Sequence, residues 1–273
     1  MGVLLIVVAA VWGAGTGLVL PRAAHRFSVE PGEPWSANCP AGHPITGAWG
    51  GWLGRSVCPA TEPAPEQTTA PPTAPAAEPI PPAQHATPCG TYGPNTPTVS
   101  TAAALICAAL AAAAGGPHPE TVVWVLLTPV AVLLTLVDYR VHRLPDVLTL
   151  PLAAALAVLL GVAALLPAAT GSWPTALLGG PALGAVYLVL FLINPAGMGF
   201  GDVKLALALG VALGWYGWQI LLTGAFVGLL YGAVYGLGMV VLRRAGRRTA
   251  IPLGPFMLGG ACTGLLLGAF AAS

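Results

Sequence analysis

The stretch that decides the fold is residues 122–151, VVWVLLTPVAVLLTLVDYRVHRLPDVLTLP. An apolar run reaches Asp138 without a charge, a short segment with two arginines follows, and a second apolar run begins after Asp146. Uncharged runs of about 20 residues are long enough to cross the hydrocarbon core of a bilayer as helices. We therefore predict two membrane-spanning helices joined by a charged turn.

The composition of the whole chain agrees with this interpretation. Hydrophobic residues make up 56% of the 273 residues and charged residues only 7%, against about 25% charged residues in a typical soluble domain. The formal net charge is +1, which excludes a nucleic-acid binder that relies on a basic surface to neutralise phosphates. The chain is expected to be an integral membrane protein with the lipid bilayer as its surroundings.

Similar apolar runs recur along the chain and predict an all-α polytopic membrane protein with about eight transmembrane helices. The first run, residues 1–20, lacks a positively charged start, so we expect a retained spanning helix rather than a cleaved signal peptide. The predicted spans are residues 3–20, 99–115, 120–137, 147–167, 174–193, 203–217, 218–242 and 252–271.

The positive charges predict the orientation. With these spans, all ten Lys and Arg residues fall on one side of the membrane, and the alternate loops carry none. By the positive-inside rule that side is cytoplasmic, so both termini are expected outside. The cytoplasmic side then holds one large loop, residues 21–98. Within it, residues 59–88 are rich in Pro, Ala, Thr and Glu, which predicts a flexible tether.

The acidic residues narrow the search for chemistry. Only three aspartates occur, Asp138, Asp146 and Asp202, and all map to the predicted cytoplasmic edge of the helices. Asp138 and Asp202 are far apart in sequence but are expected at the same membrane level. Two carboxylates in close proximity share a proton, so one can activate water while the other protonates a leaving amine. An ionisable residue at the edge of a membrane-spanning helix is costly to bury, so each of these aspartates is a candidate functional residue.

A structural interpretation of the same residues stays open at this point. An aspartate at the start of a helix is usually a cap or a partner of the helix dipole, which is the interpretation favoured for Asp146. Asp202 could also cap its helix. Asp138, at the end of a helix, opposes the helix dipole and needs another reason. Glycines before Asp202, including Gly199 and Gly201, would let the backbone and an extended substrate strand approach closely.

Three segments resemble motifs of one family, the bacterial type IV prepilin peptidases. Residues 138–151, DYRVHRLPDVLTLP, resemble the first catalytic motif, and residues 199–204, GFGDVK, resemble the glycine-rich GxGDxK signature. Residues 251–256, IPLGPF, match a third family segment. The resemblance covers residues 99–273 closely and the first hundred residues loosely.

The resemblance implies a GxGD-type membrane aspartyl protease with Asp138 and Asp202 as its catalytic residues. It also implies supporting roles for the motif positions Gly199, Gly201, Lys204, Pro145 and Asp146. Lys204 is expected near enough to Asp202 to lower its pKa. Family members cleave a positively charged leader from prepilin-like or pseudopilin-like precursors after a glycine, at the cytoplasmic face of the bacterial cytoplasmic (inner) membrane, for type IV pilus assembly.

The resemblance also raises the question of cofactors. Longer family members bind zinc through two Cys-x-x-Cys pairs and methylate the new N-terminus with S-adenosylmethionine. Here Cys39, His43, Cys58 and Cys89 could supply three thiolates and one imidazole to a tetrahedral zinc ion, although their spacing is unusual. A decayed site with unligated thiols is the alternative. Cleavage itself needs no cofactor, and no recognisable nucleotide-binding glycine motif supports methylation.

The sequence thus predicts three parts: a first transmembrane helix at 1–20, a cytoplasmic loop at 21–98 with the Cys/His cluster and the insertion 59–88, and a peptidase domain at 99–273. The competing hypothesis from another class is a proton- or cation-coupled transporter that uses the same aspartates. A transporter needs acidic residues along a path through the bilayer, often with inverted repeats. The clustering of the acids at one face makes it the weaker hypothesis. A non-catalytic assembly factor is a third possibility.

Overall fold

The computed structural model describes residues 2–30, 32–58, 90–195, 197–242 and 252–273. Within these ranges the regular secondary structure is helical, apart from two isolated β-bridges in the loop after the first helix. This confirms the predicted all-α class. The helices are α1 Gly2–Phe27, α2 Ala48–Gly51, α3 Thr96–Ala114, α4 Pro119–Val141, α5 Asp146–Ala164, α6 Trp173–Ile193, α7 Phe200–Gly214, α8 Trp218–Val241 and α9 Gly254–Ala272.

Seven of the helices in the described ranges are long and apolar enough to cross a membrane: α1, α3, α4, α5, α6, α8 and α9. This confirms a polytopic membrane protein. The eighth long helix, α7, has 15 residues and lies at the centre of the bundle in contact with α5, α6, α8 and α9. A helix that is apolar on all sides is stable when other helices surround it. Helix α7 is therefore a core helix of the bundle.

Close helix packing depends on small residues, as is usual where lipid supplies no hydrophobic drive between helices. The crossing of α6 and α7 is the clearest case: a Cβ added to Gly210 would overlap the carbonyl oxygen of Gly179. The backbones of the two helices touch at this point, and no larger residue would fit. This crossing fixes the position of α7, whose first turn carries Asp202.

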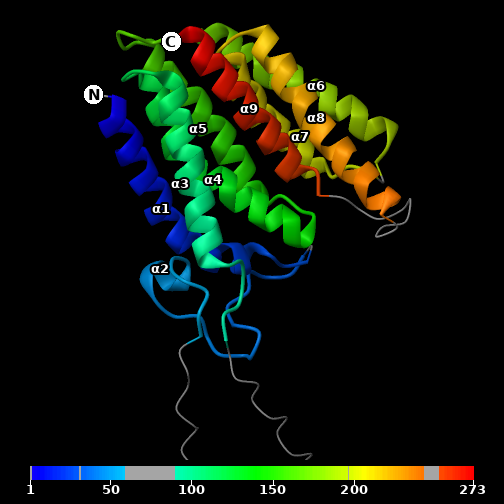
Figure 1. Cartoon of the computed structure of the whole chain (residues 1–273). Helices are drawn as coiled ribbons and strands as arrows, with labels where there is room; N and C mark the ends of the chain where they lie inside the picture. Colours follow the sequence, from blue (N-terminus) through cyan, green and yellow to red (C-terminus); the bar gives the residue numbers. More distant parts are fainter. Residues whose placement is uncertain (1, 31, 59–89, 196, 243–251) are drawn as a thin grey trace, which may run out of the picture.

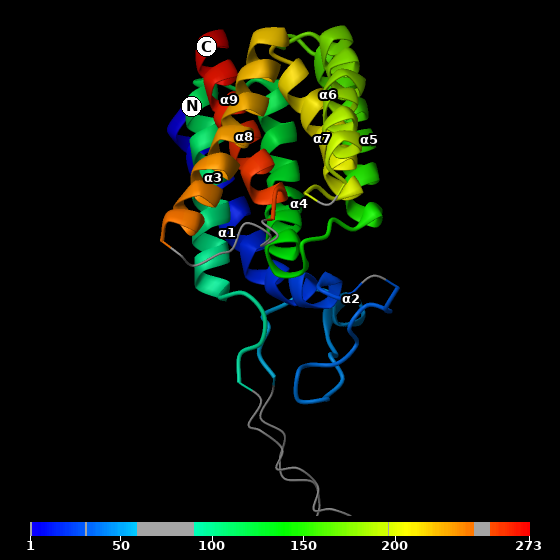
Figure 2. The same ribbon diagram turned by 90° about the vertical axis from the view of Figure 1, so that its right-hand side faces the viewer.

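The two ends of the bundle differ. Both chain termini lie at one end, and the loop that contains α2 lies beyond the other end (Figure 1). The turn between α4 and α5 and the first turns of α7 and α9 lie at the loop end (Figures 1 and 2). Segments that carry the sequence motifs therefore meet on the side of the bundle that faces the loop.

The first helix is longer than the predicted span 3–20, since it continues through Pro21 to Phe27. The added turns carry two arginines that hold the loop. Arg22 donates to the carbonyl oxygen of Thr46 at 3.0 Å, and Arg26 donates to that of Gly50 at 2.6 Å and lies over the ring of Trp52. These bonds stabilise helical turns beyond a proline that the sequence pattern placed at the end of the helix.

Six of the ten positive charges belong to described residues, and the segments that carry them lie at the loop end of the bundle (Figure 1). The end of α1 and the loop after it carry Arg22, Arg26 and Arg55, the end of α4 and the turn after it carry Arg140 and Arg143, and the start of α7 carries Lys204. The other four, at positions 243, 244, 247 and 248, lie outside the described residues, as does the predicted tether 59–88. The charge distribution that predicted the cytoplasmic side thus holds for every cation that the structure describes.

Candidate active site

Asp138 lies in the last full turn of α4 and is only 3% exposed. Its Oδ2 accepts a hydrogen bond of 2.9 Å from the backbone N–H of Gly254, at the start of α9. Beyond it, His142 ends the helix in the left-handed conformation and donates its N–H to the carbonyl oxygen of Asp138. The carboxylate that the helix dipole disfavours is therefore held by a donor from a segment 116 residues away.

Asp202 occupies the first turn of α7 and is 6% exposed. Its Oδ2 accepts a hydrogen bond of 3.0 Å from the N–H of Gly199, the residue before the helix. This is the carboxylate half of a capping box, in which the third helical residue bonds back to the N-cap. Asp202 therefore takes part in capping α7, although the N-cap itself is Gly199. Its carboxylate is nevertheless buried, at the loop end of the bundle.

The two aspartates are buried on segments that are packed against each other, and the charge of Asp138 acts on Asp202. A Cβ added to Gly201 would lie 3.0 Å from the Cβ of Leu144, in the turn between α4 and α5. The glycine next to Asp202 thus allows the first motif to approach the second.

Lys204 and Asp146 form an ion pair that the sequence did not predict. The Nζ of Lys204 lies 2.6 Å from Oδ2 of Asp146, and the ammonium also lies over the ring of Phe200. The ammonium of Lys204 thus bonds to Asp146, and its expected effect on the pKa of Asp202 stays a prediction. Asp146 does not cap α5, whose N-cap is Pro145, but it lies in the first turn of that helix, where an acidic side chain interacts favourably with the helix dipole.

The structure gives each of the predicted supporting residues a place. Pro145 is the N-cap of α5, and Gly199 donates its N–H to Asp202. Gly201 allows the close approach to Leu144, and the ion pair of Lys204 with Asp146 links the two motifs.

Sequence reasoning missed two neighbours. Gly254 holds Asp138, and the third family segment was the signal for it. Tyr187 of α6, 1% exposed, lies near enough to Asp202 for charge interaction; no motif marked it.

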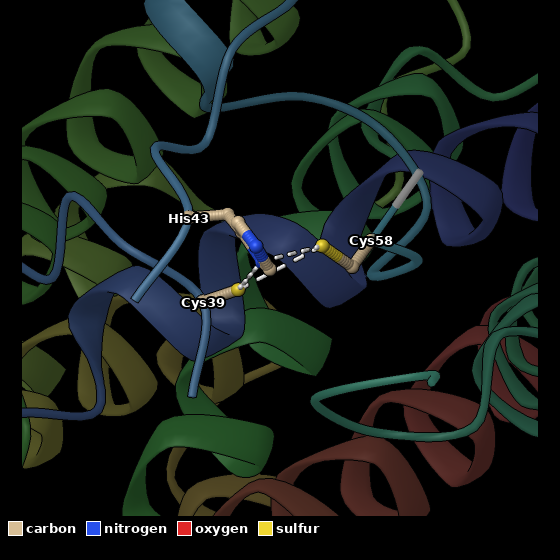
Figure 3. Close-up of side chains that lie close together, drawn as sticks. All are labelled: Cys39, His43 and Cys58. Atoms are coloured by element: carbon tan, nitrogen blue, oxygen red, sulfur yellow. Dashed lines mark hydrogen bonds between the residues drawn. The ribbon is translucent and has the colours of Figure 1, made fainter. Parts of the chain in front are cut away.

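The Cys/His cluster forms a second candidate site, in the loop between α1 and α3. Cys39 Sγ lies 3.6 Å from His43 Nδ1 and 3.8 Å from Cys58 Sγ, and Cys58 Sγ lies 3.4 Å from His43 Nδ1, with the three side chains pointing toward one another (Figure 3). Tetrahedral zinc with Zn–S near 2.3 Å and Zn–N near 2.0–2.1 Å sets its ligand atoms about 3.5–3.8 Å apart. The measured distances fit the edges of such a tetrahedron. The fourth predicted ligand, Cys89, lies outside the described residues.

Two short turns assemble this cluster. A tight turn joins Cys39 to His43, whose carbonyl oxygen accepts from the N–H of Cys39. A bridge pairs Val57 with Thr91, and the N–H of Cys58 donates to the carbonyl oxygen of Gly90. The described residues on the two sides of the insertion, Cys58 and Gly90, therefore lie side by side. Burial raises the pKa of the neighbouring Tyr92 phenol, which keeps it neutral beside the thiols.

The fold and these sites define a class: a polytopic membrane protein with two buried aspartates, from separate motifs, at the same end of a helical bundle. Residues 124–241 match the type IV leader peptidase family, and they contain both aspartates. This segment is a type IV leader peptidase domain, and the resemblance based on the motifs is confirmed. Residues 252–255, which include the Gly254 N–H that bonds to Asp138, lie beyond the matched residues.

Several curated relatives are prepilin leader peptidase/N-methyltransferases. The protein of Aeromonas salmonicida (strain A449) is 39% identical over 153 residues, which cover 52% of this chain and 47% of the relative. That of Pseudomonas aeruginosa is 37% identical over 137 residues, 48% of this chain and 44% of the relative. The protein of Bacillus subtilis (strain 168) is 29% identical over 186 residues, which cover 66% of this chain and 71% of the relative. The chain thus spans about half the length of the first two relatives. No solved structure matches it significantly.

Proposed function

We propose that this chain is a membrane-embedded aspartyl endopeptidase that removes the leader of type IV prepilin-like or pseudopilin-like precursors after a glycine. The single observation that supports it most is the burial of Asp138 and Asp202 at the same end of the bundle, each bonded to a backbone N–H, inside a leader peptidase domain. The competing transporter hypothesis is not favoured, because the domain belongs to a protease family.

The mechanism follows from the pair of carboxyl groups. Two buried carboxylates close together cannot both ionise cheaply, so the pair holds one proton. The ionised aspartate takes a proton from water as the water oxygen attacks the carbonyl carbon of that glycine. The protonated aspartate then gives its proton to the leaving nitrogen as the C–N bond breaks. One water is consumed, and the products are the leader carboxylate and a new N-terminal amine.

The location of the site suits this reaction. The six described cations lie at the same end of the bundle as the aspartates, and the positive-inside rule assigns that end to the cytoplasm. A positively charged leader would remain there while the apolar part of its precursor stays in the bilayer. We therefore place the protein in the bacterial cytoplasmic membrane with its active site facing the cytoplasm.

One experiment tests cleavage and methylation together. Purified protein is incubated with a pilin-like precursor, with and without S-adenosylmethionine, and the products are weighed by mass spectrometry. We expect removal of the leader in both samples and, if methylation is retained, a product heavier by one methyl group only with the cofactor. A precursor that stays intact in both samples would refute the proposed function.

Zinc is the second part of the proposal. Cys39, His43 and Cys58, joined by Cys89, would hold a structural ion that fixes the fold of the loop between α1 and α3. The proteolytic step does not involve it. The fit rests on the spacing of the described ligand atoms.

Metal analysis by mass spectrometry tests the zinc site directly. The purified full chain is expected to carry about one zinc ion, and Cys58→Ser to lose most of it, because one of four ligands is gone. Cys107→Ser is the matched control, since Cys107 is buried in α3 and is not part of the cluster. Equal zinc content in wild type and Cys58→Ser would contradict the assignment.

A further inference from the structure

An apolar groove runs along the bundle between α4 and α9, with α3, α5 and α7 contributing to its walls. Its volume is about 400 Å³. The hydroxyls that line it are already bonded to their own helix: Thr128 donates to the carbonyl oxygen of Trp124, and Thr135 to that of Ala131. The walls therefore present hydrocarbon and satisfied polar groups, and the occupant they suit is apolar.

The groove is aligned with one of the aspartates. The α4 residues that line it include Trp124, Thr128, Ala131 and Thr135, whose spacing of four, three and four residues keeps them on one helix face. The next position on that face is Asp138. On the opposite wall, the lining of α9 begins at Pro255, the residue after the glycine that holds Asp138. Both walls thus lead to the same carboxylate.

We propose that this groove receives the apolar helix of the precursor, on the carboxyl side of the bond that is cut. The inference rests on the proposed function and adds the surface that selects the substrate. The part of a precursor that follows its leader enters the membrane. The lining of the groove begins one helical turn from Asp138, at Thr135, and continues along the membrane-spanning part of α4 and α9. A helix seated in it brings its first residues to the aspartates.

The size of the groove limits what enters it. From Thr135 back to Trp124 the lining extends about 16 Å along α4 at 1.5 Å per residue. A whole helix, 10–12 Å across, would occupy on the order of 1,300 Å³ over that length, which is well above the observed volume. The groove instead accommodates the side chains of one stripe, as ridges of one helix enter the grooves of another. The contacts should therefore repeat every three or four residues of the substrate.

A native cysteine allows a direct test of this contact. Cys262 of α9 lines the groove and is partly exposed, whereas Cys107 is fully buried and does not line it. Full-length Asp138→Asn protein, which should leave the precursor intact, is mixed with precursors that each carry one cysteine along the apolar segment, and is then oxidised. We expect disulfide adducts at positions three or four residues apart, and their loss in the Cys262→Ala variant.

Two outcomes of the crosslinking would overturn the inference. One is the absence of adducts at every position although the precursor is bound. The other is a phospholipid that co-purifies in the groove and prevents adducts at all positions, which would assign the groove to lipid. If the Asp138→Asn protein cuts the precursor, the failure belongs to the proposed function, and the two failures are distinguishable.

A kinetic comparison supplies an independent arm. Ala131→Leu fills the groove, and its matched control is Ala109→Leu, at an exposed position of α3 that does not line it. For each, kcat/KM is measured on a full precursor and on a short peptide that ends a few residues after the cut. For Ala131→Leu we expect kcat/KM on the full precursor, divided by kcat/KM on the short peptide, to fall at least tenfold, mainly because KM for the full precursor rises. For Ala109→Leu we expect this quotient to keep its wild-type value. An equal ratio in both variants would overturn the docking site.

Discussion

Asp138→Asn and Asp202→Asn will each lower the rate of leader removal by at least about 10²-fold, the range associated with the loss of a general acid or base. Asparagine preserves the size of each side chain and can still accept the N–H of Gly254 or Gly199 through its amide oxygen. What it cannot do is hold or accept the catalytic proton. The measurement is the initial rate of precursor conversion in isolated membranes, with expression of each variant checked by immunoblot.

Asp146→Asn is the matched control for these two variants. It removes the third aspartate of the same region, and with it the charge that pairs with Lys204. Because the Asp146 side chain is 59% exposed, the pair is close to a surface ion pair, which contributes about 0–1 kcal/mol. Asp146→Asn should therefore retain most of the activity. Rapid cleavage by Asp138→Asn or Asp202→Asn, or an equal loss in all three, would contradict the assignment of the pair.

The arrangement of the aspartates could be predicted because it follows from hydropathy. Apolar runs locate the helices, and the positive charges in the loops assign each helix end to one side of the membrane. Because successive helices cross the membrane in alternate directions, Asp138 and Asp202 come to the same side. None of these steps needs side-chain contacts. The same reasoning predicted most helix bounds to within a few residues and separated α7 from α8, although the predicted span 203–217 runs three residues past the observed end of α7 at Gly214.

The contacts at the site could not be predicted in the same way. Whether Lys204 approaches Asp202 or Asp146 depends on which way one long side chain turns, and the motif spacing does not contain that information. The continuation of α1 past Pro21 depends on loop carbonyls that accept from Arg22 and Arg26. The groove is formed by residues of five helices, so no single segment carries a signal for it.

Gly254→Ala is the second variant for which we expect a large effect, a loss of leader removal of about 10–100-fold. A Cβ added to Gly254 would lie 2.8 Å from Oδ2 of Asp138 and 3.1 Å from its Cγ, so the carboxylate or the first turn of α9 must move. Displacement of a catalytic group by about 1 Å can cost about 10²-fold in rate. The chemistry of both aspartates is unchanged, so the variant tests whether their position matters.

Gly238→Ala is the matched control, because an added Cβ at this position of α8 meets no heavy atom within 4 Å. The same substitution should there leave cleavage near the wild-type rate. The thermal unfolding midpoint of both variants is measured with the rate, since a general loss of folding would lower the midpoint of Gly254→Ala as well as its activity. A Gly254→Ala protein that cleaves within about twofold of wild type would show that the N–H from α9 does not position Asp138. The third motif would then serve the fold without setting the geometry of the acid pair, because 10²-fold sensitivity to a 1 Å shift is what a positioning role requires.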